Sequence, residues 1–202
     1  MKPNLVAIGL RAKTARAIVV VVGGTADSPL VLAKTEIKLW DPKFPATGQP
    51  YHHVMDLPGE EWPQAVQKSA RAIEKIAIKA LATLMKEQAV KGREVRAVAT
   101  VGAKDRNLAS IGNPHIRAHA AEGILFRRVL DNAAQKNGLL ARAFAERDFD
   151  QILRHELGMK SDAVKKKLDQ AARALPPPWR ADEKLAAMAA WLVLHQLQNR
   201  ER

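Results

Sequence analysis

Four cationic residues follow two short apolar stretches of the sequence, and their types and positions suit the binding of phosphate. Arg11 and Lys13 come at the end of the first stretch, and Lys104 and Arg106 come after a second one at residues 95–101. In open α/β sheets, ligands bind in the crevice outside the carboxyl ends of the strands. We therefore expect the four cations to gather at that edge, where the forked arginine side chains would bind phosphate oxygens.

A second group of residues with ligand chemistry lies on one predicted helix. His115, His119 and Glu122 are spaced at i, i+4 and i+7, so they share a helix face and could bind zinc. His52 or His53 could supply a fourth ligand. Because the spacing matches no known metal motif, a polar or capping role is the favoured interpretation, and we predict neither a metal nor another cofactor.

The elements that must position these residues are β-strands separated by helices. The first apolar stretch is apolar on both faces, and such a strand is normally central and covered by helices on each side. Residues 41–59 hold four prolines and two glycines, which predicts a long loop. Hydrophobic periodicity predicts five strands and five helices: strands at residues 5–10, 18–22, 30–40, 95–101 and 139–145, and helices at residues 60–91, 115–136, 148–157, 160–175 and 182–198.

The length and composition favour one folded domain. The chain has 202 residues, 47% of them hydrophobic, which is enough for one sizeable core over residues 1–202. It has no cysteine, which excludes disulfides, thiolate metal sites and a cysteine nucleophile. The sequence contains no stretch of about 18 apolar residues, so it predicts no membrane span. No signal-peptide pattern follows Met1. We therefore expect a cytoplasmic protein.

The charge of the chain points to a polyanionic partner. The net charge is +12 and the sequence pI is about 10.2. The positive residues are spread over both halves of the chain, so the excess belongs to a folded surface. Nucleic acid is therefore the predicted partner, ahead of an anionic membrane, and we predict no membrane association. The alternative is that the positive charge only keeps the protein soluble and that no polyanion is bound.

Three segments, together with the order of the elements, resemble one known family. Residues 7–13 look like an opening strand and turn, residues 160–164 look like the start of a late helix, and residues 176–183 look like the approach to a closing helix that bears an acid. The chain resembles the RuvC-type Holliday-junction resolvases of the ribonuclease-H-like superfamily. The resemblance implies an α/β fold with a five-stranded mixed sheet, in the order 3-2-1-4-5, and helices on both faces.

The chain departs from that family where its chemistry takes place. The resemblance implies acids on the first strand, the fourth strand and the last helix, which hold two metal ions. Here the strand positions fall on Arg11 and near Thr100, and the usual position in the last helix falls on Leu185, with Asp182 and Glu183 nearby. A divalent cation beside Arg11 would be repelled by several kcal/mol at an effective dielectric constant of about 20. We therefore predict that the two-metal site is absent.

Two functions follow from these departures. The first is a non-catalytic nucleic-acid-binding protein on a RuvC-like scaffold, in which Arg11, Lys13, Lys104 and Arg106 bind the polyanion. If these four cations do not bind a polyanion, they are solvated side chains around a vestigial site, and Asp182 and Glu183 are their counter-charges. The alternative function is a divalent-metal-dependent endonuclease with relocated carboxylates, for which the candidates are Asp105, Asp182, Glu183, and Asp41 or Glu36.

The resemblance also suggests that the chain could form a homodimer. Two surfaces are candidates for the contact. One is the helix around Phe126 and Leu130, and the other is the side of the last helix that carries Trp191.

Overall fold

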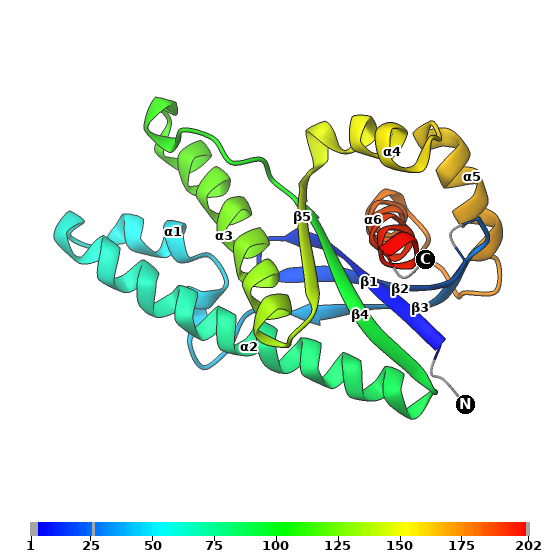
Figure 1. The fold of residues 1–202 in the computed structure, drawn as a ribbon. Coiled ribbons are helices and arrows are strands. Elements are labelled where there is room, and N and C mark those ends of the chain that lie inside the picture. Colours follow the sequence, from blue (N-terminus) through cyan, green and yellow to red (C-terminus); the bar gives the residue numbers. More distant parts are fainter. Residues whose placement is uncertain (1–3, 26, 201–202) are drawn as a thin grey trace.

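The central element of the fold is a five-stranded mixed sheet with the strand order β3-β2-β1-β4-β5 (Figure 1). The structure is a computed structural model and describes residues 4–25 and 27–200. β1 pairs antiparallel with β2, and β2 pairs antiparallel with β3, whereas β4 and β5 continue the sheet in parallel. This is the strand order that the family resemblance implied. The strands are β1 (Asn4–Lys13), β2 (Arg16–Gly24), β3 (Pro29–Lys38), β4 (Arg93–Gly102) and β5 (Leu140–Ala145).

Helices cover both faces of this sheet (Figure 1). The long helices α2 and α3 lie on one face, while α6 lies against the other, with α4 and α5 packed around its outer side. The bounds of the helices are α1 (Pro50–His53), α2 (Trp62–Val90), α3 (Pro114–Lys136), α4 (Phe149–Leu157), α5 (Ser161–Ala171) and α6 (Ala181–Arg200). Among the described residues, no helix combines the length and the apolar character that crossing a membrane requires.

The side chains of β1 divide between two hydrophobic cores because successive residues of a strand point to opposite faces. Val6, Ile8 and Leu10 are buried against α2 and α3, whereas Ala7 is buried on the side of α6. Gly9 also faces α6, and a Cβ atom built on it would lie 1.8 Å from the carbonyl oxygen of Ala186. The absence of a side chain at Gly9 therefore lets the backbone of α6 approach the central strand closely.

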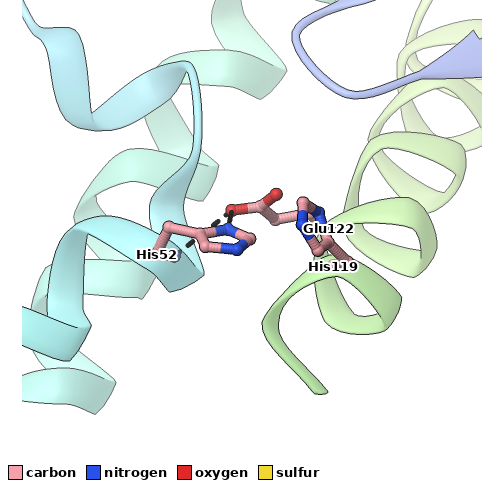
Figure 2. A group of neighbouring side chains, drawn as sticks. All are labelled: His52, His119 and Glu122. Atoms are coloured by element: carbon pink, nitrogen blue, oxygen red, sulfur yellow. Dashed lines mark hydrogen bonds and ion pairs between the residues drawn. The ribbon is translucent and has the colours of Figure 1, made fainter. Parts of the chain in front are cut away.

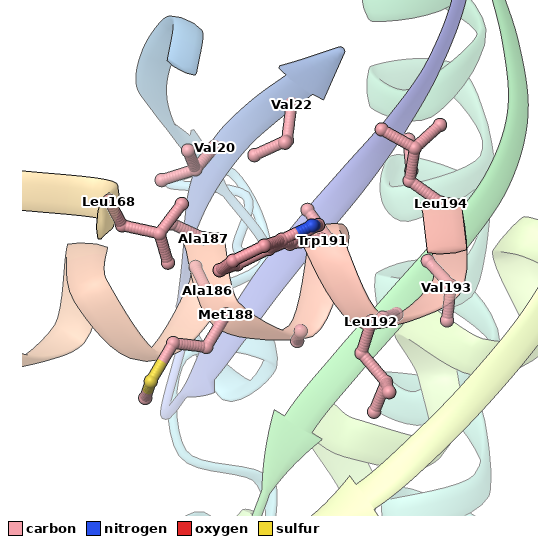
Figure 3. Close-up of a cluster of buried hydrophobic side chains, with 14 of the residues drawn as sticks. Val20, Val22, Leu168, Ala186, Ala187, Met188, Trp191, Leu192, Val193 and Leu194 are labelled. Atoms are coloured by element: carbon pink, nitrogen blue, oxygen red, sulfur yellow. The ribbon is translucent and has the colours of Figure 1, made fainter. Parts of the chain in front are cut away.

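The core beneath α6 is built around Trp191, whose side chain is fully buried (Figure 3). Figure 3 shows the indole beside Ala187 of the same helix, with Val20 and Val22 of β2 on one side and Leu168 of α5 on another. The ring thus joins the sheet, α5 and α6 in one apolar cluster.

The side chains suggested for a dimer contact are buried inside the protein. Trp191 lies in the core beneath α6, and Phe126 and Leu130 of α3 lie in the core on the opposite face of the sheet. All three side chains have no exposed area. That part of the sequence interpretation was wrong, because the apolar residues on these helices are needed to cover the sheet.

Two local predictions also need correction. The predicted loop at residues 41–59 contains short helical segments, namely Pro45–Thr47, α1 and Val54–Asp56. Proline begins the first two of these segments, as its fixed φ angle favours at a first helical position. In addition, β1 continues to Lys13, and the turn of the hairpin lies at residues 14–15. Arg11 therefore lies on the strand and not in the turn.

Candidate functional site

The carboxyl ends of β1, β4 and β5 lie at one edge of the sheet because these three strands are parallel. Arg11, near the end of β1, is only 8% exposed. Its Nη2 lies 2.6 Å from Oε2 of Glu146, which follows β5, and its Nε lies 3.1 Å from Oδ1 of Asp182 in the first turn of α6. Lys13 Nζ lies 3.0 Å from the same Asp182 oxygen. Arg11 therefore links the sheet to α6 through ion pairs.

The carboxylate of Asp182 is held in its charged form by these cations. Burial alone would raise the pKa of Asp182, but hydrogen bonds from Lys13 and Arg11 outweigh burial and hold the pKa below its ordinary value. Since the folded pKa is lowered, the ion pairs stabilise the fold fully above the unfolded pKa of about 3.9. This stabilisation is lost as the pH falls through the lower folded pKa.

Replacing Asp182 with asparagine should therefore make stability less dependent on acid pH. At pH 7 we expect Asp182→Asn to be less stable by about 1 kcal/mol, a value kept small because the side chain is partly exposed to solvent. Below about pH 4 the difference between the two proteins should shrink. Urea unfolding at pH 7, 4 and 2.5 measures this, with Asp56→Asn as control, because Asp56 forms no ion pair among the described residues. A difference that stays constant with pH would contradict the assignment.

Lys104 and Arg106 lie at the same edge, where they line an open pocket of about 630 Å³ beyond the end of β4. Arg147 and Glu146, which follow β5, line the pocket as well. Lys104 Nζ lies 2.9 Å from Oδ2 of Asp148. Within the described part of the chain, Arg106 and Arg147 form no ion pair, so their guanidinium groups are free to bind an anion.

The structure thus places the four predicted cations at one edge but in two different situations. Lys104 and Arg106 line the pocket. Arg11 reaches the pocket only through Glu146, and Lys13 is paired with Asp182. The sequence interpretation missed Glu146 and Arg147. Their position directly after the last strand was the available signal, because the rule that selected Lys104 applies equally to β5.

The other acids near this edge are held by arginine side chains or by the backbone. Asp105 is bound by Arg127 and Arg128 at 2.8 and 3.1 Å. The hydrogen bond from Arg127 is the main reason why the pKa of Asp105 is lowered. Glu183 accepts a hydrogen bond from the backbone N–H of Arg180 at 2.9 Å and so closes the first turn of α6.

The remaining candidate acids lie apart from this edge network or are already paired. Glu36 on β3 lies 2.7 Å from Arg16, and Asp41 accepts a hydrogen bond from the backbone N–H of Lys43 at 2.8 Å. At the fourth-strand position, the side chain of Thr100 is fully buried. Over residues 4–25 and 27–200, none of these candidate acids belongs to a group of three or more histidine, aspartate and glutamate side chains close enough to hold one ion.

The histidines form a separate group between α1 and α3 (Figure 2). Ligand atoms of His52, His119 and Glu122 all lie within 4.8 Å of one another. The His115 ring lies further out, with its centroid 5.8 Å from that of His52. The helix spacing therefore identified His119 and Glu122 together, but His52 takes the third place that the sequence gave to His115.

The fold is similar to that of solved structures, although two comparisons made at the level of sequence found no match. No protein-family model matches the chain, and no curated protein matches it either. The structure of RuvC from Thermus thermophilus is similar with a TM-score of 0.51 and 13% sequence identity, over 96% of both chains.

Two further solved structures are less similar. T. thermophilus RuvC in complex with a Holliday junction substrate has a TM-score of 0.49 and 12% identity over 96% of both chains. A Ppx/GppA family member from Aquifex aeolicus has a TM-score of 0.39 and 11% identity, over 83% of this chain and 41% of that one.

The sheet order and the similarity to RuvC define the class of the fold. The chain has a ribonuclease-H-like α/β fold with an open five-stranded mixed sheet. Within that class the fold is of the RuvC type.

Proposed function

We propose that this protein binds nucleic acid at the carboxyl edge of its sheet and does not cleave it. The observation that carries the proposal is the pocket beyond β4, where Lys104, Arg106 and Arg147 converge and the two arginines have no acidic partner among the described residues. Guanidinium groups bind phosphate oxygens through pairs of hydrogen bonds. The RuvC-type fold is consistent with a nucleic-acid-related role.

The charge of the whole chain favours a long polyanion over a small phosphate compound. The net charge is +12, and such an excess raises the local concentration of polyanions and speeds their association. Contacts with the phosphate backbone release counterions, so binding at this edge should weaken steeply as salt increases.

The ion pairs at the edge support binding without cleavage. Arg11 stands at the first-strand position where the family resemblance implies a metal-ligating acid, and both of its contacts are with acids. Asp182 therefore forms ion pairs with Arg11 and Lys13. A divalent cation at this place would have to displace two positive charges from that carboxylate, which opposes binding by several kcal/mol.

Reversing the charge of the two unpaired arginines should weaken nucleic-acid binding strongly. We expect the double variant Arg106→Glu and Arg147→Glu to bind about tenfold or more weakly, with a salt slope shallower by about 2, because two phosphate contacts are lost. Fluorescence anisotropy with labelled duplex DNA, a four-way DNA junction and single-stranded RNA, each at several salt concentrations, measures both quantities.

The matched control changes the same number of charges elsewhere. Lys79→Glu and Lys86→Glu alter two exposed lysines of α2, on a different part of the surface. This variant lowers the net charge equally, so it reports the contribution of overall charge, and we expect it to bind less than about threefold more weakly. Equal losses in both variants would remove the pocket as the binding site. Magnesium- or manganese-dependent cleavage that Asp182→Asn abolishes would instead favour the nuclease.

A further inference from the structure

We propose that His52, His119 and Glu122 form a binding site for a transition-metal ion of the zinc class, between α1 and α3. This site is separate from the proposed nucleic-acid interface and does not depend on it. Figure 2 shows His52 reaching across from α1 toward the carboxylate of Glu122, with His119 beside that carboxylate on α3. The site therefore combines side chains from two segments that are far apart in the sequence.

The local structure brings the three side chains to one place. His119 and Glu122 are three residues apart on α3, so they project from the same face of the helix. The short helix α1 then places His52 opposite them, with its ring centroid 4.3 Å from that of His119. One ligand atom from each residue lies within 4.8 Å of the others. His119 is exposed, so its side chain can turn toward the other two.

Two buried polar atoms at this place lack a partner, and this observation points to a ligand. The Glu122 side chain has no exposed area, and its Oε1 accepts hydrogen bonds from Nδ1 of His52 at 2.9 Å and from the backbone N–H of His52 at 3.3 Å. The other oxygen, Oε2, and the other ring nitrogen, Nε2 of His52, are buried without a hydrogen-bond partner among the described residues. Buried polar groups are normally satisfied, so each such atom requires an explanation. A cation bound by the carboxylate of Glu122 would satisfy Oε2.

The contact between His52 and Glu122 marks where the ion would bind. Nδ1 of His52 lies 2.9 Å from Oε1 of Glu122. A neutral imidazole can carry its proton on either ring nitrogen, so with the proton on Nε2 the lone pair of Nδ1 is free to bind an ion that the carboxylate also binds.

The ligand types select the class of metal. Two imidazoles with one carboxylate suit zinc and neighbouring transition metals, whereas magnesium and calcium prefer sites built from oxygen. Three protein ligands leave a fourth position of a tetrahedral ion open. The ring of His115, on the preceding turn of α3, has its centroid 5.8 Å from that of His52 and is outside the group of three.

Titration of the protein with zinc tests the proposal. After removal of any affinity tag and treatment with a chelator, calorimetry with zinc chloride should give one site with a dissociation constant of about 1 μM or tighter. His119→Ala should weaken this binding about tenfold or more, because it removes a ligand. The same zinc concentration should raise the melting temperature of the unaltered protein more than that of the variant.

His53→Ala is the matched control, because His53 is the exposed neighbour of His52 on α1 and lies outside the group. It should bind zinc as the unaltered protein does, and circular dichroism should show that both variants are folded. The proposal is overturned if the unaltered protein binds no zinc at this level. It is also overturned if His119→Ala binds zinc unchanged, or if His53→Ala loses as much affinity as His119→Ala.

Discussion

Replacing Gly9 with alanine should lower the free energy of unfolding by about 3 kcal/mol or more, although the change adds a single methyl group. A Cβ atom at this position would lie 1.8 Å from the carbonyl oxygen and 2.6 Å from the carbonyl carbon of Ala186. These are backbone atoms of α6, so no side-chain rotation can relieve the overlap. The helix would have to move away from the sheet and loosen the core beneath it.

Urea unfolding followed by circular dichroism measures this loss, and Gly112→Ala is its control. A Cβ atom on Gly112 would meet no atom within 4 Å, so that variant should be within about 0.5 kcal/mol of the unaltered protein. If Gly9→Ala were equally harmless, α6 could not lie as close to β1 as the structure places it.

Truncating Trp191 to alanine should cost about 3–5 kcal/mol, because a fully buried aromatic side chain would leave a cavity between β2, α5 and α6. Trp40 provides the comparison within the same chain, since its side chain is 39% exposed. Trp40→Ala should cost less than about 1 kcal/mol. Thermal and urea unfolding of both variants measure the difference. Similar losses at the two positions would contradict the arrangement in Figure 3.

The sheet could be predicted from the sequence because each strand has a recognisable local pattern of apolar residues. Ile18 and the valines that follow it are β-branched and continuous, as expected of a strand covered on both faces. The position of β1 at the centre of the sheet followed from the same reasoning, and the strand order followed from the family resemblance. These predictions are confirmed.

The segment that carries His52 could not be predicted in the same way. Its prolines and glycines indicate a break in regular structure, but they do not show that Pro50 begins a helical turn. Nor do they show that this turn packs against α3. The histidine spacing on α3 was visible in the sequence, whereas the arrival of His52 depends on the tertiary fold.

The ion pairs at the sheet edge show a similar limit. That Arg11 would lie at this edge followed from its position after an apolar stretch. Its partners Glu146 and Asp182 are 135 and 171 residues away along the chain. No local pattern links residues so far apart. Asp182 could be named as a counter-charge only through the family resemblance, and Glu146 was not anticipated at all.

The close packing of α6 on β1 has a consequence for how the chain folds. The first strand is at the start of the described chain and the helix that covers it is at the end, so one face of the sheet cannot be completed from neighbouring segments. Closing so long a loop costs entropy before the contacts it permits are formed. High contact order of this kind slows folding. Intermediates in which α6 does not yet cover the sheet should expose apolar surface and be prone to aggregation.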